Sequence, residues 1–227
     1  MENIIELKNV EKTYILKNLD VPVLHDINLD INKGEMLGIV GPSGSGKSTL
    51  MNIIGLLDRP SKGDYFLEGE KITLNMSDKK LAKIRASKIG FIFQSFNLLP
   101  KQDTLANVLI PTSYLKRKTQ SKENALKLLD KVGLAHRINH KPTEMSGGEK
   151  QRIAIARALI NNPDIILADE PTGNLDSKSG QQIIDILKNL NSEGKTILII
   201  THDDKIACQC QRIIRIFDGS IKGGSND

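Results

Sequence analysis

The sequence has little of what marks disulfide-bonded or membrane-spanning chains. Its 227 residues include only two cysteines, Cys208 and Cys210, with one residue between them. A disulfide at this spacing would be strained, and two thiolates alone do not complete a zinc site. We therefore interpret both as small, semi-buried residues of a reducing cytosol. No unbroken apolar stretch approaches the ~20 residues needed to cross a bilayer, so any membrane role must act through a partner.

Signals for secretion and for disorder are also missing. Met1 leads directly into strand-like residues 4–7, so we expect no signal peptide and a cytoplasmic location. Gly (18) and Pro (8) are not in excess, and 39% of the residues are hydrophobic. This composition predicts a folded chain with a packed core, organised as one domain that carries a subdomain.

The chain is basic, with a formal net charge of +5 and a pI near 9.1. Such a balance suits a phosphate-bearing ligand, an anionic membrane surface or nucleic acid. The charges are scattered along the chain, however, so we predict no nucleic-acid partner.

Apolar runs of strand length alternate with helical patterns, which predicts an α/β fold with a mostly parallel sheet covered on both faces. The predicted buried strands are residues 36–40, 89–93, 165–168 and 197–200. The predicted helices are residues 49–54, 146–160 and 183–190, the last closed by Gly194. The first third of the sequence predicts short strands, and one of them is residues 27–31, where apolar and polar residues alternate. Between residues 97 and 132 a Pro-interrupted segment precedes a helix with one apolar face, formed by Ala125, Leu128, Leu129 and Val132.

The most specific motif is a Gly- and Ser-rich loop between a predicted strand and a predicted helix. It fits G-x-x-x-x-G-K-[ST] at every fixed position. Its glycines let successive N–H groups point at phosphate oxygens, and the following helix adds its positive end. We expect Lys47 to neutralise phosphate charge and the Ser48 hydroxyl to bind Mg²⁺, whereas a flexible linker would have no reason to lie here. The predicted nucleotide contacts are Gly41, Pro42, Ser43, Gly44, Ser45, Gly46, Lys47, Ser48 and Thr49.

An acidic pair, Asp169 and Glu170, ends a predicted strand. Ligands of parallel sheets bind at the carboxyl ends of the strands, so these carboxylates should face the bound phosphates. We expect Asp169 to hold Mg²⁺ through water and Glu170 to polarise the water that attacks the γ-phosphate. Such a pair alone is usually a solvated loop, but the phosphate loop upstream favours the catalytic interpretation.

Ser146, Gly147, Gly148 and Glu149 precede an apolar helix. Ser146 and Glu149 fit a capping box, which is the structural interpretation. A capped helix start with two glycines is also an anion-binding surface, and a simple cap does not need two glycines that lower helix stability.

These three motifs together resemble an ATPase subunit of the ABC transporter family, in an order that matches from about residue 5 to residue 219. The resemblance implies a P-loop NTPase (RecA-like) core with an antiparallel β-subdomain and a helical subdomain. We predict a single ATPase domain over residues 1–222. Residues 1–94 and 158–222 would form the core with its β-subdomain, residues 95–157 the helical part, and residues 223–227 a polar tail.

The resemblance also implies roles for residues that no pattern here assigns. Tyr14 corresponds to the aromatic residue that stacks on adenine, and Gln94 to the glutamine that touches Mg²⁺ and relays to the membrane subunit. His202 corresponds to the histidine that contacts the γ-phosphate, and Asp176 to an acidic residue that communicates across a dimer. In this family two subunits pair head to tail around two Mg-ATP. Each subunit places its surface at Ser146 against the ATP that the other subunit binds.

Within the family, three segments resemble the macrolide-exporter and lipoprotein-release branch (MacB, LolD and FtsE types). They are residues 55–60, 93–100 and 173–176. This implies a transmembrane permease contacted through the segment after Gln94, a position at the cytoplasmic face of the membrane, and export. An ABC ATPase that signals at the membrane without transport, as in division-type relatives, stays open.

Other ATPase classes fit less well. Between Lys47 and Ser146 there is no room for the long coiled coils of DNA-repair types, and the single ATPase unit differs from the tandem units of translation types. A P-loop GTPase is disfavoured because the sequence has no Asn-Lys-x-Asp motif.

Overall fold

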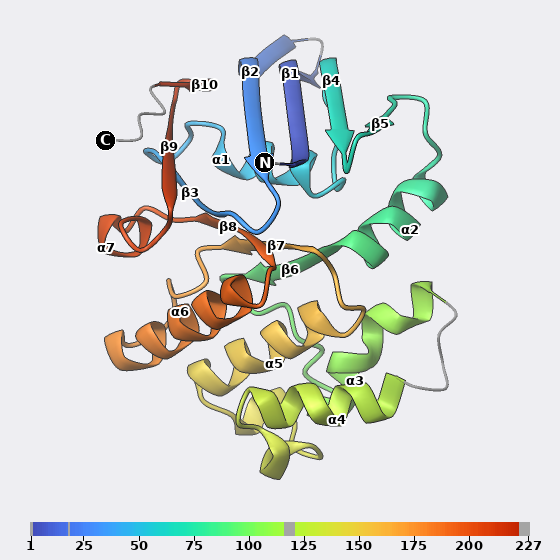
Figure 1. The fold of residues 1–227 in the computed structure, drawn as a ribbon, viewed down its shortest axis with the longest axis vertical. Coiled ribbons are helices and arrows are strands. Elements are labelled where there is room, and N and C mark those ends of the chain that lie inside the picture. The colour runs from blue at the N-terminus through green and yellow to red at the C-terminus, as the bar shows by residue number, and fades with distance from the viewer. Residues whose placement is uncertain (1, 18, 116–120, 223–227) are drawn as a thin grey trace. The chain divides into compact units, whose positions relative to one another are not determined.

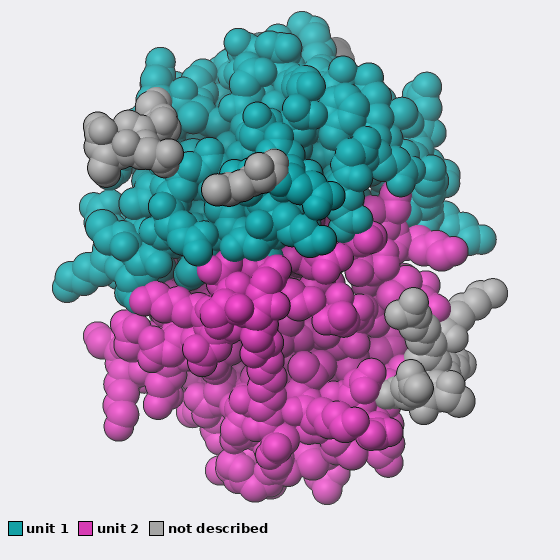
Figure 2. Space-filling view, in the orientation of Figure 1, with its two compact units in different colours: residues 1–81, 196–227 teal, residues 82–195 magenta. Residues whose placement is uncertain are grey.

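The computed structural model describes residues 2–17, 19–115 and 121–222. It contains two compact units, residues 1–81 with 196–227 and residues 82–195 (Figure 2). These units do not follow the predicted subdomain bounds, which remain a prediction. The predicted polar tail, residues 223–227, lies outside the described residues.

The first unit contains an antiparallel sheet in the order β2-β1-β4-β5 (Figure 1). Its strands are β1 (Asn3–Leu16), β2 (Leu19–Asn32), β4 (Lys62–Leu67) and β5 (Glu70–Ile72). This confirms the predicted β-subdomain, but β1 and β2 are 14 residues each, longer than the short strands we predicted. The register between β1 and β2 is irregular, and Asn9 and Asp26 have positive φ. These irregularities interrupt the alternation of apolar and polar residues that would have indicated the full length of the strands.

The first unit also holds a parallel sheet. Strand β3 (Met36–Val40) lies between β8 (Thr196–Ile200) and β9 (Arg212–Phe217), parallel to both, and β10 (Ser220–Ile221) adds an antiparallel edge. Every residue of β3 and β8 is buried, as their apolar sequences predict. Helices α1 (Lys47–Ile54) and α7 (Asp204–Ala207) follow the carboxyl ends of β3 and β8. The loops before these helices therefore leave the same edge of the sheet.

The second unit combines a parallel strand pair with helices. Strands β6 (Ile89–Phe93) and β7 (Ile165–Asp169) pair in parallel. Helices α3 (Thr104–Leu109), α4 (Ser121–Lys131) and α5 (Gly147–Leu159) pack on one another (Figure 1), and α5 also contacts β6 and α6 (Ser177–Ser192). Short 3-10 turns are η1 (Ile110–Tyr114), η2 (Ala135–Arg137) and η3 (Pro142–Glu144). The predicted strands, the α4 helix and the helix after Ser146 are confirmed.

Helix α2 (Asp78–Lys88) was not predicted. Its sequence carries no apolar stripe at helical spacing, and Leu81 is its only buried residue. Among the described residues, no helix has both the length and the apolar character that crossing a bilayer requires.

Candidate functional site

The predicted phosphate loop lies between β3 and α1, in the strand–loop–helix context that its motif requires. Two glycines are needed there by close packing. A Cβ on Gly41 would lie 2.1 Å from the carbonyl oxygen of Ile216, and one on Gly46 would lie 2.8 Å from Leu24 Cδ2. Gly46 also has a φ of 101°, which other residues adopt only with strain. The backbone of the loop is thus held in a tight curl.

The polar groups of this loop fit a phosphate. Helix α1 has no side-chain cap and no acidic residue in its first turn, so its positive end is open to an anion. The Lys47 ammonium donates to the carbonyl oxygens of Gly41 and Pro42, both at 2.7 Å, which holds a positive charge against the loop. The Ser45 hydroxyl is buried and has no hydrogen-bond partner in the described part of the chain. Ser48 is exposed in the first turn of α1, where its hydroxyl can bind a cation.

Tyr14 lies near the end of β1, and its side chain is half-exposed. Its hydroxyl donates to Asp58 Oδ2 at 2.8 Å. The Tyr14 hydroxyl is therefore held by the turn that follows α1. His202, in the same unit, is exposed and lies just after β8.

The acidic pair and Gln94 lie together in the second unit. Asp169 is the last residue of β7 and pairs in register with Phe93 of β6. Because the strands are parallel, Gln94 and Glu170 both follow at the same edge. Asp169 and Glu170 are half-buried, and Glu170 has a positive φ of 45°, which turns the chain sharply after the strand.

Gln94 is held by the segment after Glu170. Its carbonyl oxygen accepts a hydrogen bond from Asn174 Nδ2 at 2.9 Å. Gly173 leaves room for the Gln94 side chain, because a Cβ on Gly173 would lie 2.6 Å from Gln94 Nε2. The fully buried Gln151 of α5 donates to the carbonyl oxygen of Pro171 at 2.7 Å. These contacts join the loop after β6, the loop after β7 and the start of α5.

Ser146 is the N-cap of α5 in a complete capping box. Its hydroxyl accepts from the Glu149 backbone N–H, and the Glu149 carboxylate accepts from the Ser146 backbone N–H at 2.9 Å. That backbone hydrogen bond lowers the pKa of Glu149, and burial opposes it. Because the folded pKa is depressed, the stabilisation is present above the unfolded pKa of about 4.3 and is lost as the pH falls. The capping box is confirmed. The same helix start could also bind an anion, and that interpretation stays a prediction.

Replacing Ser146 by Ala should lower the free energy of unfolding by about 1 kcal/mol, because the first turn of α5 loses its side-chain acceptor. Urea denaturation measures the change. Ser192→Ala is the matched control, since that hydroxyl donates to the Asn189 carbonyl in the last turn of α6 and caps no N-terminus. Equal stability of Ser146→Ala and the parent chain would contradict a stabilising cap.

Gly147 and Gly148 place the start of α5 against its neighbours. A Cβ on Gly147 would lie 3.1 Å from Leu175, and one on Gly148 would lie 3.2 Å from Ser179 Oγ. Asp176 is exposed and caps α6, accepting from the backbone N–H of Lys178 and Ser179. Hydrogen bonds from Ser179 lower the pKa of Asp176, so it is a carboxylate at neutral pH.

The predicted site residues therefore form two groups. The first unit brings together Tyr14 and the loop of residues 41–49 and carries His202 at the same edge of its sheet. The second brings together Gln94, Ser146–Glu149, Asp169, Glu170 and Asp176.

Three further residues organise these groups, and they were not predicted from the sequence. Asp58 accepts the Tyr14 hydrogen bond, and Gln151 ties α5 to the segment after Glu170. Arg157 of α5 donates to the carbonyl oxygens of Phe96 and Asn97, two successive residues at positive φ. Only Asp58 carried a signal, as part of the segment of residues 55–60 noted above.

Comparison with known proteins identifies the family. Residues 24–173 match the family model described as ABC transporter. The chain belongs to the ABC transporter family. It is an ATP-binding and ATP-hydrolysing cassette of that family, as the resemblance of its motifs implied.

Two curated relatives illustrate its place in the family. The chain is 53% identical to the Macrolide export ATP-binding/permease protein MacB of Bdellovibrio bacteriovorus, covering 96% of the chain but only 33% of that protein. It is 50% identical to the uncharacterized ABC transporter ATP-binding protein YknY of Bacillus subtilis, over 98% of the chain and 96% of the relative. The chain thus spans about a third of the MacB relatives and nearly all of the YknY type.

A solved structure shares the fold. The dimeric structure of the ATP-binding cassette MJ0796 in a post-hydrolysis state, bound to ADP and Pi, matches with a TM-score of 0.89 and 46% identity over 97% of both chains. The predicted α/β cassette fold is confirmed.

Proposed function

We propose that this ABC cassette pairs head to tail with a second copy around two Mg-ATP and drives a membrane permease, in a system that exports its substrate. The observation that carries the proposal is the loop of residues 41–48. A tightly curled backbone, an uncapped helix start, the Lys47 ammonium and the unpartnered Ser45 hydroxyl all gather there. Such a combination of donors suits a triphosphate.

The metal site would use oxygen ligands from three side chains. Mg²⁺ takes hydroxyl, carboxylate and amide oxygens, which are the donors that Ser48, Asp169 and Gln94 offer. When bound, the ion would supply charge neutralisation on the β- and γ-phosphates. Lys47 would neutralise the same phosphates from the loop.

Catalysis would use the end of β7. Glu170 would accept a proton from the attacking water, and His202 would contact the γ-phosphate. The positive φ of Glu170 supports this role, because the chain turns sharply there at the sheet edge. Tyr14 would stack on the adenine base.

The second copy would complete each site. The capped start of α5 at Ser146, Gly147, Gly148 and Glu149 would face the γ-phosphate bound by the partner, with Asp176 beside it. The dimeric structure of MJ0796, a cassette 46% identical to this chain, supports the pairing.

The permease would bind the segment after Gln94 and hold the chain at the cytoplasmic face of the membrane. A shallow groove of about 190 Å³ is lined in part by Ser95, Phe96, Leu98 and Pro100 of that segment and by Lys150 of α5. Arg157 donates to the carbonyl oxygen of Phe96, which lines the groove, and to that of Asn97. The similarity to proteins named macrolide export ATP-binding/permease proteins favours export.

Replacing Lys47 by Ala should weaken ATP binding by roughly 10²- to 10⁴-fold. Two charge-assisted hydrogen bonds to phosphate oxygens, each contributing about 1.5–3 kcal/mol, would be lost. Isothermal titration with Mg-ATP measures this. Lys33→Ala, an exposed lysine of a turn in the same unit, is the control and should bind normally. An affinity within threefold of the parent for Lys47→Ala would refute the proposed phosphate site.

A further inference from the structure

Tyr14 is part of a partly buried polar cluster that the phosphate chemistry does not use. Its hydroxyl donates to one oxygen of the Asp58 carboxylate, and the Lys12 ammonium donates to the other at 2.7 Å. Lys12 also donates to the carbonyl oxygen of Arg59 at 2.7 Å. Its Nζ lies 4.6 Å from the centroid of the Tyr14 ring, within the range of a cation–π interaction.

Strand geometry explains how Lys12 reaches the ring. Lys12 and Tyr14 are two residues apart on β1, so their side chains point to the same face. Lys12 is only 8% exposed although Tyr14 is half-exposed. The buried ammonium therefore lies over the ring, while part of the Tyr14 side chain stays exposed to a ligand.

Asp58 comes from the turn that follows α1 and is itself held firmly. Its backbone N–H donates to the carbonyl oxygen of Asn52, and its carboxylate accepts a third hydrogen bond from the Arg59 backbone. The Arg59 guanidinium in turn donates to Met76 and Asp78. Asp58 is therefore a fixed acceptor, and the tyrosine hydroxyl points at it.

The charges keep this cluster in one protonation state. Burial would raise the pKa of Asp58, but the hydrogen bonds from Lys12 and Tyr14 outweigh it and lower that pKa. Burial, together with the Asp58 carboxylate, raises the pKa of Tyr14. At neutral pH the carboxylate is ionised and the phenol protonated, so the hydrogen bond between them is maintained.

We propose that Lys12 and Asp58 are positioning residues that fix the Tyr14 ring for stacking on the base of the bound nucleotide. The inference rests on the proposed stacking role of Tyr14. It gives a role to Asp58 in the segment of residues 55–60, which the phosphate chemistry leaves without one.

The test compares ligands with and without a base. Dissociation constants for Mg-ATP, Mg-GTP and inorganic tripolyphosphate are measured for the parent, Tyr14→Ala, Lys12→Met and Asp58→Asn. Tyr14→Ala should weaken both nucleotides by about 5- to 150-fold, and Lys12→Met and Asp58→Asn by roughly 3- to 30-fold. Tripolyphosphate affinity should not change in any of them. Lys12→Met should cause no further loss in a Tyr14→Ala background.

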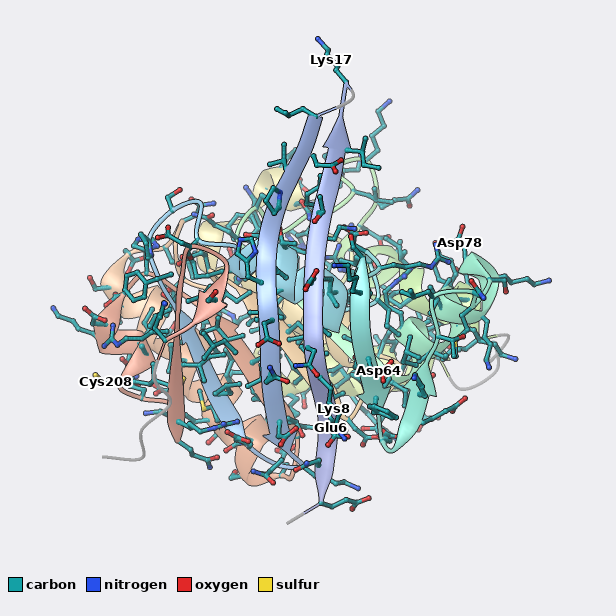
Figure 3. The ribbon with its side chains drawn as sticks, turned by 90° about the horizontal axis from the view of Figure 1, so that it is seen from above. Glu6, Lys8, Lys17, Asp64, Asp78 and Cys208 are labelled. Atoms are coloured by element: carbon teal, nitrogen blue, oxygen red, sulfur yellow. The ribbon has the colours of Figure 1, made fainter. Side chains whose placement is uncertain are left out.

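A matched control lies on the same strand. The Lys8 ammonium lies 5.3 Å from the centroid of the Phe66 ring and pairs with Glu6, and Glu6 and Lys8 are labelled together on β1 in Figure 3. Lys8→Met removes a similar cation from a different aromatic ring and should leave nucleotide binding unchanged.

The outcomes separate the two proposals. If Tyr14→Ala binds ATP as tightly as the parent, the stacking role of Tyr14 is wrong. If Tyr14→Ala weakens ATP binding but Lys12→Met and Asp58→Asn do not, only the positioning role is wrong. Equal losses for ATP and tripolyphosphate would also overturn the positioning role, because the substitutions would then act on the phosphates or on the fold. Thermal melting of each variant identifies unfolding, and the double variant Lys12→Met/Asp58→Asn, which removes both charges, carries the test where a single substitution leaves its charged partner unpaired.

Discussion

Glu170→Gln should hydrolyse ATP about 10²- to 10⁴-fold more slowly than the parent chain, while binding ATP normally. The amide keeps the size and polarity of the side chain but cannot accept a proton from the attacking water. ATP contacts made by the loop of residues 41–49 stay intact, because that loop lies elsewhere in the chain. The variant should therefore accumulate as a nucleotide-bound dimer, which gel filtration with Mg-ATP would detect.

A second glutamate tests whether the effect is specific. Glu193 follows α6 and forms an exposed ion pair with Lys131, so Glu193→Gln should hydrolyse ATP at the parental rate. Steady-state phosphate release measures both variants. A rate for Glu170→Gln within a few-fold of the parent would remove Glu170 from the role of general base.

The parts of the fold that the sequence predicts best are those with local signals. Strands β3 and β8 are unbroken apolar runs, and the capping box at Ser146 is complete within four residues. The phosphate loop is likewise contiguous. For such segments the residues that decide the structure are neighbours in the chain, so the pattern and the structure coincide.

The parts that were missed depend on partners distant in sequence or lack a pattern. Asp58 meets Lys12 across 46 positions, and Arg157 meets Phe96 across 61, so no spacing rule indicates either contact. Strand β9 contains Arg212 and Arg215 and lacks the unbroken apolar run that marks β3. Helix α2 has no apolar stripe.

The proposed roles of the site residues come from the family resemblance and not from the geometry of the site. Nothing in the spacing of Tyr14, Gln94 or His202 assigns them a function, and the resemblance to ABC ATPases supplied one. The structure adds local detail, such as Gly173 making room for Gln94 and Asn174 binding its carbonyl oxygen. The roles themselves remain predictions that mutants must test.

Two defective chains, Lys47→Ala and Ser146→Arg, should each fail to occlude ATP as a homodimer and should recover occlusion when mixed. In the head-to-tail arrangement each ATP site takes Lys47 from one chain and Ser146 from the other. A mixed dimer then has one site with both lesions and one site with neither. The Arg side chain would block the cap of α5 against the partner's γ-phosphate, and Ala would remove the ammonium proposed to neutralise the phosphates.

The most direct measurement is the retention of radiolabelled ATP by mixed dimers. The two chains carry different affinity tags, and mixed dimers are isolated by purification through both tags. Both chains also carry Glu170→Gln, which prevents hydrolysis. Lys47→Ala and Ser146→Arg homodimers, purified the same way, are the controls. Sharing of the site between copies predicts about one retained ATP per mixed dimer and none in either homodimer. No retention in mixed dimers that demonstrably form would mean that both residues serve the ATP of their own chain, and it would contradict the shared site.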